Sequence, residues 1–238
     1  MVEPDPDFPP CPYNLPHPGR QEAHVWRIDL DDQRPAVLSE TERERAAAMR
    51  HAEKQMHYIS ARTALRLILA RYTEQDPALL PIATSAQGKP FLDLDGALQF
   101  NLSHAQGKAL VAVAQVPVGI DLEFPRAIWQ MDRLVADYFS PEEAQEMSQL
   151  SQAERDAAFL AAWTRKEACL KATGEGIGGG LHRYRVTLRP HEKARLVAIE
   201  GSEDKARAWS LHGFAPFTDA QAALCLQAEN TSFRGFTF

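Results

Sequence analysis

The hydrophobic residues of this 238-residue chain follow two different spacings. Apolar positions recur every three or four residues over 61–72 and over 152–172, and this spacing predicts two long amphipathic helices. Shorter apolar runs bounded by turn residues predict strands, at residues 25–30, 98–102, 110–116, 118–124, 184–188, 194–199, 208–214 and 222–228. Together these elements predict an α+β fold.

Capping signals indicate where the helices begin and end. Residues 39–42 (SETE) and 140–143 (SPEE) both have a serine followed three residues later by glutamate, which is the capping-box pattern. Pro141 stands at the first helical position, where proline is favoured. Gly174 follows the last apolar position of the second long helix and predicts a glycine C-cap.

The two halves of the chain contain similar short motifs in the same order. Residues 28–31 (IDLD) resemble residues 120–123 (IDLE), and the capping-box serine precedes a helix threonine by the same interval in both halves (39–63 and 140–164). Chance could produce this match, but an ancient duplication explains it better. We therefore predict two similar lobes related by a pseudo-two-fold axis, each an antiparallel sheet packed with a long helix. A site between such lobes would be assembled from both.

This reading divides the chain into three parts. Residues 1–20 are rich in proline and predict an extended arm. Residues 21–116 form the expected N-terminal lobe. Residues 117–238 form the expected C-terminal lobe, which carries most of the candidate chemistry.

Composition excludes several classes of function. The net charge of −6 argues against a general nucleic-acid binder, which usually has a basic stripe. No apolar run approaches the roughly 18 residues needed to span a bilayer, and the first residues lack the pattern of a secretory signal. The three cysteines form no CxxC pair, so we expect neither a disulfide framework nor a cysteine zinc site. These features favour a cytoplasmic protein. We expect a monomer, because two lobes within one chain can form a cleft without a second copy.

Asp121 and Glu123 are the first candidates for catalytic chemistry. Alternate side chains of a strand point to opposite faces, so the two carboxylates share the face opposite Ile120 and Leu122, with Cα atoms about 7 Å apart. Two like charges at this distance repel unless a cation or a positive side chain neutralises them. A solvated strand face is the alternative reading of this pair.

Glu167 is the second candidate. It follows Phe159 and Trp163 at intervals of four, so it lies in line with an aromatic row that should face the core. A carboxylate that is buried away from water needs a counter-ion or a hydrogen-bond donor. Lys171, one helical turn later, would be that counter-ion in an ordinary ion pair along the helix. Otherwise Glu167 would join Asp121 and Glu123 as an oxygen ligand for a hard cation such as Mg²⁺.

Side chains suited to phosphate binding occur in the first half. Ser103 and His104 end a predicted strand, and Lys89 lies in a predicted turn at residues 87–90. Ordinary turn chemistry and solvated lysines are the alternative reading. The glycine-rich residues 174–180 follow a helix end rather than a strand. We therefore interpret them as a cap and a loop that borders a partner site, and not as a phosphate-binding loop.

Taken in order, these segments resemble the 4'-phosphopantetheinyl transferase superfamily, specifically its larger, two-lobed and monomeric Sfp type. The resemblance spans about residues 25–230. It is carried by residues 88–90 (GKP), 100–104 (FNLSH), 119–123 (GIDLE) and 163–168 (WTRKEA), followed by Lys171.

This resemblance implies a transfer of the 4'-phosphopantetheine group from coenzyme A to a serine of an apo acyl or peptidyl carrier protein, with release of 3',5'-ADP. It implies Mg²⁺ as the cofactor, with Mn²⁺ as a substitute, and coenzyme A bound between the lobes. The implied metal ligands are Asp121, Glu123 and Glu167. The implied contacts to coenzyme A are Arg62, Thr63, Lys89, Ser103, His104, Lys166 and Lys171.

We hypothesise catalytic roles for Glu167, Lys171 and Asp121. Glu167 is the candidate general base, Lys171, with Lys166, would stabilise charge on the phosphoryl oxygens, and Asp121 would hold the metal. Two other functions would use the same residues. One is another Mg²⁺-dependent hydrolase of coenzyme A or a nucleotide, and the other is a binding module for coenzyme A or a carrier protein without turnover.

Overall fold

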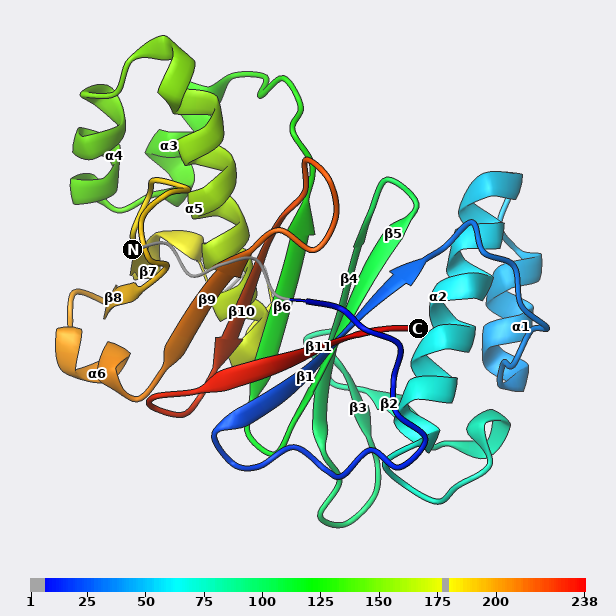
Figure 1. Ribbon diagram of the computed structural model, residues 1–238. Helices are drawn as coiled ribbons and strands as arrows, with labels where there is room; N and C mark the ends of the chain where they lie inside the picture. Colours follow the sequence, from blue (N-terminus) through cyan, green and yellow to red (C-terminus); the bar gives the residue numbers. More distant parts are fainter. Residues whose placement is uncertain (1–6, 177–179) are drawn as a thin grey trace.

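The first sheet has four strands in the order β11-β1-β5-β4. In the computed structural model, which describes residues 7–176 and 180–238, these strands are β1 (Glu22–Asp29), β4 (Gln99–Ala105), β5 (Lys108–Ala114) and β11 (Ser232–Thr237). The long helix α2 (Ala52–Ala70) covers one face of this sheet, packing Leu65, Ile68 and Leu69 against alternate residues of β5 (Figure 1).

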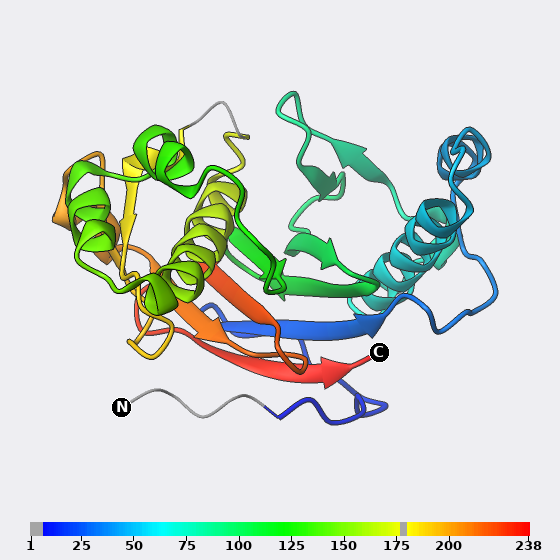
Figure 2. The same ribbon diagram turned by 90° about the horizontal axis from the view of Figure 1, so that it is seen from above.

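The second sheet has three strands in the order β6-β10-β9. They are β6 (Val118–Glu123), β10 (Gln221–Leu226) and β9 (Ser210–Phe214), and helix α5 (Gln152–Thr173) packs against them. The remaining faces of the two sheets pack on each other in a shared core that includes Leu110, Ile120 and Leu224. Helices α2 and α5 consequently lie on opposite sides of the molecule (Figure 2).

Shorter elements complete the chain. Helices α3 (Met131–Tyr138) and α4 (Pro141–Ser148) precede α5, and α6 (Glu203–Arg207) lies between β8 and β9. Two small hairpins are formed by β2 (Ile82–Thr84) with β3 (Pro90–Leu92), and by β7 (Tyr184–Val186) with β8 (Leu196–Ile199). Within the described residues, 3₁₀ turns occur at Pro77–Leu79 and Leu181–Arg183.

The structure confirms the α+β class and the helix ends expected from the sequence. Ser39 and Ser140 are N-caps with complete capping boxes, and Gly174 ends α5 with a left-handed φ of 75°. The helical region after Ser39 is divided into α1 (Glu40–Ala47) and α2. Residues 177–179 of the glycine-rich segment, and residues 1–6 of the proline-rich arm, lie outside the described part of the chain.

The first sheet is mixed, whereas the sequence predicted an antiparallel one. The last strand, β11, pairs in parallel with β1, so the end of the chain returns from the second half to the first sheet. This pairing was missed because the hydrophobic pattern of Ser232–Thr237 is too short to predict a strand, and no local signal indicates its distant partner. Among the described helices, none is both long and apolar enough to cross a membrane.

Candidate active site

Gly119 allows helix α5 to lie directly on strand β6. A Cβ atom at this position would overlap the backbone of Ala168 and Ala172 in α5. The helix backbone therefore takes the place of a side chain, and the next outward residues of β6 come close to the side chains of α5. This contact brings Asp121 and Lys171 together.

Asp121 is the most deeply buried acidic residue of the site, with only 4% of its surface exposed. Its Oδ1 atom accepts a hydrogen bond from Lys171 Nζ at 2.5 Å and another from Ser103 Oγ at 3.0 Å. Lys171 Nζ also donates to Ser103 Oγ at 3.2 Å. Three elements, β4, β6 and α5, thus meet in one small polar cluster.

Side chains of β4 fasten the first sheet to the second at this point. Asn101 Oδ1 accepts the backbone N–H of Ile120 at 2.8 Å, and Ser103 Oγ accepts that of Leu122 at 3.3 Å. Asn101 was not among the residues singled out by sequence. Its place in the FNLSH motif, two residues before Ser103 on the same strand face, was the available signal.

Glu123 and Glu167 complete an acidic group around Asp121. Burial and the neighbouring charge of Asp121 raise the pKa of Glu123, although Arg126 is bound to it at 3.1 Å. The same two effects, with a smaller contribution from Glu123, raise the pKa of Glu167. The charge of Asp121 therefore destabilises the ionised forms of Glu123 and Glu167. Contrary to the simple helix-pair reading, Lys171 binds Asp121 and not Glu167.

The donor set of this acidic group suits a divalent cation, although the described residues contain no ready-made cluster of three metal-binding side chains. The second oxygen of Asp121, Oδ2, is buried and lacks a hydrogen-bond partner. An unpaired buried carboxylate oxygen is costly unless it gains a cation or a donor. Hard oxygen ligands beside it, at Glu123 and Glu167, are the kind that Mg²⁺ prefers.

A pocket of about 260 Å³ opens beside this acidic group. It is walled by α5 through Glu167, Leu170 and Lys171, by β4 through Asn101 and Leu102, and by the turn at 87–90. The pocket thus lies between elements of the two halves, with carboxylate and ammonium groups in its wall.

Lys89 reaches from the turn of the β2–β3 hairpin to the second half. Its Nζ donates to the carbonyls of Val118 and Ala172, at 3.1 Å each. Burial lowers its pKa from 10.5 to about 8. Lys89 is therefore both a tie between the halves and a cation at the pocket wall.

His104 lies one residue after Ser103 on β4 and is exposed. Partial desolvation, together with the nearby charges of Lys171 and His57, lowers its pKa. A neutral imidazole there can donate one hydrogen bond.

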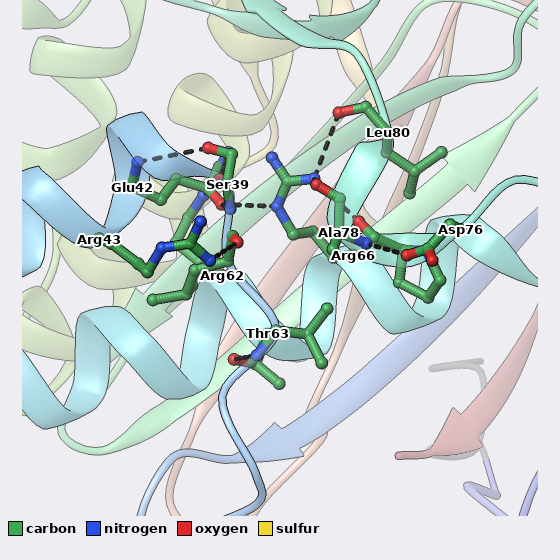
Figure 3. A network of polar contacts seen from close by, with 12 residues as sticks. Ser39, Glu42, Arg43, Arg62, Thr63, Arg66, Asp76, Ala78 and Leu80 are labelled. Atoms are coloured by element: carbon green, nitrogen blue, oxygen red, sulfur yellow. Dashed lines mark hydrogen bonds and ion pairs between the residues drawn. The ribbon is translucent and has the colours of Figure 1, made fainter.

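Arg62 and Thr63 lie apart from this pocket, in contrast to the expectation. Arg62 Nε donates to Glu42 Oε1 at 2.5 Å, and Arg66 Nε donates to the other oxygen of Glu42 at 2.5 Å (Figure 3). The hydroxyl of Thr63 is buried and accepts the backbone N–H of Val37 at 3.1 Å. These interactions fix α1 on α2, so they account for both residues without a ligand.

Lys166 also differs from its expected role, because it points into the core of the second half. Its side chain is 0% exposed, and Nζ pairs with Glu143 at 2.6 Å. The same ammonium donates to the carbonyls of Leu181, at 3.1 Å, and Tyr184. Adjacent helix residues point about 100° apart, so Lys166 and Glu167 cannot share one site.

Comparison with known proteins identifies the family. The chain is 34% identical over 215 residues to the 4'-phosphopantetheinyl transferase HetI of Nostoc sp., with 86% of this chain and 87% of that protein covered. The chain belongs to the 4'-phosphopantetheinyl transferase superfamily. A family model described as "4'-phosphopantetheinyl transferase superfamily" matches residues 117–225, which run from β6 to β10.

Other members of this superfamily match over a smaller part of the chain. The 4'-phosphopantetheinyl transferase psf-1 of Bacillus pumilus is 33% identical over 177 residues, covering 71% of this chain and 72% of that protein. A protein of Synechocystis sp. named as a putative 4'-phosphopantetheinyl transferase is 32% identical over 179 residues, covering 71% and 70%. The predicted family and enzyme class, a 4'-phosphopantetheinyl transferase, are confirmed.

Proposed function

We propose that this 4'-phosphopantetheinyl transferase moves the phosphopantetheine group of coenzyme A onto a serine hydroxyl of an apo acyl or peptidyl carrier protein. The observation that carries this proposal is the contact of Asp121 with Lys171 and Ser103. It joins an acidic group of β6 to a cationic group of α5 beside a pocket between the halves, and Glu167 and Lys171 lie in the wall of that pocket. A pyrophosphate donor needs both kinds of group, cations for its oxygens and carboxylates for its counter-ion.

Asp121, Glu123 and Glu167 would hold a divalent cation, Mg²⁺ or its substitute Mn²⁺. The unpaired Oδ2 of Asp121 and the raised pKa values of the two glutamates favour such an occupant. When bound, the ion would supply Lewis-acid polarisation and neutralise charge on the pyrophosphate of coenzyme A.

Polar residues in and beside the pocket would orient coenzyme A. Lys89 and Lys171 line the pocket and present ammonium groups for phosphate oxygens. Ser103 and His104, on the neighbouring strand β4, would add a hydroxyl and an imidazole. In the reaction, the carrier serine oxygen bonds to the phosphorus that carries the pantetheine arm. The bond from this phosphorus to the bridging pyrophosphate oxygen breaks, and 3',5'-ADP leaves with that oxygen.

Glu167 is our candidate for accepting the serine proton. It lines the pocket, and it has no hydrogen bond or ion pair to other residues that the structure describes. A carboxylate within hydrogen-bond reach of the serine hydroxyl, directly or through one water, can accept its proton. Lys171, one helical turn away, would stabilise the charge that develops on the phosphoryl oxygens.

Two similar lobes produced by duplication remain part of this proposal. The capping-box glutamates support it, because Glu42 and Glu143 are both buried and both pair with cations of the following long helix. In both halves an arginine of the long helix also donates to carbonyls later in the chain. Arg66 of α2 binds those of Pro77 and Leu80, and Arg165 of α5 binds those of Thr187 and Arg189. We also propose that the protein acts as a cytoplasmic monomer, with a first lobe at residues 21–116 that β11 joins and a second lobe that begins at residue 117.

Mass spectrometry of a carrier protein tests the proposed function. Incubation with coenzyme A and Mg²⁺ should add the mass of one phosphopantetheine group to an apo carrier and release 3',5'-ADP. The substitutions D121N and E167Q should lower the initial rate by about 100-fold or more, because each removes a charged group that acts in the transition state.

Lys108 provides a matched control for this assay. It forms an ion pair with Asp29 at 2.6 Å on the first sheet, away from the pocket, so K108M should keep near-normal transfer. Hydrolysis of coenzyme A without a mass gain of the carrier would favour the hydrolase reading. Binding of coenzyme A without either product would favour a binding module. Near-normal transfer by both D121N and E167Q would refute the site assignment.

A further inference from the structure

Lys171 already occupies the acidic group as a cation. Its ammonium lies 2.5 Å from Asp121 Oδ1 and 3.2 Å from Ser103 Oγ. Glu167 lies one turn earlier on the same helix, at the spacing that favours a Glu–Lys pair. The lysine nevertheless reaches across to β6, where the carboxylate is the most buried of the three.

A divalent ion and this ammonium compete for the same carboxylate. The two oxygens of Asp121 are about 2 Å apart, so an ion bound to either would stand within a few ångströms of Lys171 Nζ. Two cations at that distance repel strongly at a partly buried site. The ammonium is only partly enclosed, with 30% of the Lys171 side chain exposed, and it faces a pocket into which it can move.

We propose that Lys171 is the resident counter-ion of Asp121 in the metal-free protein and is displaced when a divalent cation binds. The displaced ammonium then turns from Asp121 toward the pocket, where it is free for an anionic ligand. This inference rests on the proposed metal site. It adds that the cation site is closed by the protein's own lysine until the metal arrives.

The exchange lowers the apparent affinity for the metal. A cation binds only the fraction of molecules in which Lys171 has left Asp121, and the apparent dissociation constant increases in inverse proportion to that fraction. Ser103 contributes to the closed state, because its hydroxyl contacts both the ammonium and the carboxylate. Weakening either partner of Asp121 should therefore tighten metal binding in the absence of coenzyme A.

Calorimetric titration with Mn²⁺ alone tests the displacement. We expect K171M to bind Mn²⁺ on the order of fivefold more tightly than the wild type, since methionine keeps the length of the side chain without its charge. S103A should bind more tightly by a smaller factor, although it changes no charge. K108M removes one lysine from a distant lysine–aspartate pair and should bind as the wild type does.

The Mn²⁺ affinities of the variants distinguish displacement of Lys171 from a general effect of charge. A gain in K171M without any gain in S103A would indicate a general effect of charge and would overturn the displacement. Unchanged or weaker binding by K171M would overturn it as well. If neither the wild type nor K171M binds Mn²⁺, the metal site itself is wrong, and the carrier assay then shows separately whether transfer occurs without it.

Discussion

Gly119 is the residue on which the geometry of the site depends most directly. Its hydrogen side chain lets the backbone of α5 rest on β6, and this approach sets the distance between Asp121 on the strand and Lys171 on the helix. The sequence included Gly119 in a family motif but assigned it no role. A periodicity argument counts side chains, so it cannot detect a position that is used because the side chain is missing.

The substitution G119A should therefore damage both stability and transfer. The added methyl group would meet backbone atoms of Ala168 and Ala172, which cannot move as a side chain can. We expect the free energy of unfolding to fall by about 3 kcal/mol or more. Because α5 must shift to make room, phosphopantetheine transfer should also fall in the molecules that remain folded.

Gly19 is the matched control for this substitution. A Cβ at Gly19 would have nothing within 4 Å, and its backbone does not adopt a left-handed conformation. G19A should leave both the unfolding curve in urea and the rate of transfer close to those of the wild type. Equal stability of G119A and G19A would show that the contact between α5 and β6 is loose and does not position the site.

At the scale of elements, each long helix is tied to the preceding capping box by a buried ion pair. Glu143 caps α4 through the N–H of Ser140, at 2.8 Å, and also accepts the N–H of Val186 at 2.7 Å. Its third partner is Lys166 of α5. One carboxylate thereby connects α4, α5 and β7, which explains why Lys166 is absent from the pocket.

E143Q should strongly destabilise the protein. The amide keeps the shape of the side chain, but it leaves the Lys166 ammonium buried without a counter-charge, and loss of one partner of a buried ion pair costs about 3–5 kcal/mol. E142Q is the adjacent control, because Glu142 is exposed and its unfolding curve should stay close to that of the wild type. Urea denaturation of both variants measures the difference. Similar curves would mean that the Glu143–Lys166 pair contributes little.

The elements themselves were largely predictable from the sequence, and their partners were not. The caps at Ser39, Ser140 and Gly174 depend on local chemistry, so the sequence reveals them. The direction of Lys166 depends on a glutamate 23 positions earlier, as counted along the printed sequence. The pairing of β11 with β1 joins opposite ends of the chain. Such contacts are set by the packing of the whole molecule, which no local pattern encodes.

At the scale of the whole molecule, the candidate site lies at the interface between the two halves of the chain. Asn101 and Ser103 of the first sheet bind the backbone of β6, and Lys89 binds β6 and the end of α5. The residues that would hold coenzyme A are therefore the residues that hold the two halves together. Any change in the charge of Lys89 should affect both functions.

The pH dependence of coenzyme A binding should reveal Lys89. Burial lowers its pKa from 10.5 to about 8, so the free enzyme loses this cation over a pH range in which the phosphates stay charged. We expect kcat/KM for coenzyme A to fall above pH 8, by up to about tenfold per pH unit. K89R should remove this decline, because a guanidinium stays protonated. The same decline in K89R would assign the titration to another group.

The stability of the enzyme should change with pH in the opposite direction. Between pH 8 and 10.5 the unfolded chain keeps the proton of Lys89 while the folded protein loses it, so the unfolded state binds more protons. The free energy of unfolding of the wild type should therefore rise with pH across this window relative to K89M, in which nothing titrates at position 89. Urea denaturation of both proteins at pH 7.5 and 9.5 measures this difference. If the free energy of unfolding of the wild type instead fell relative to that of K89M, the contact between the halves would favour the charged lysine. The pKa of Lys89 would then not be lowered, and the kinetic prediction would lose its basis as well.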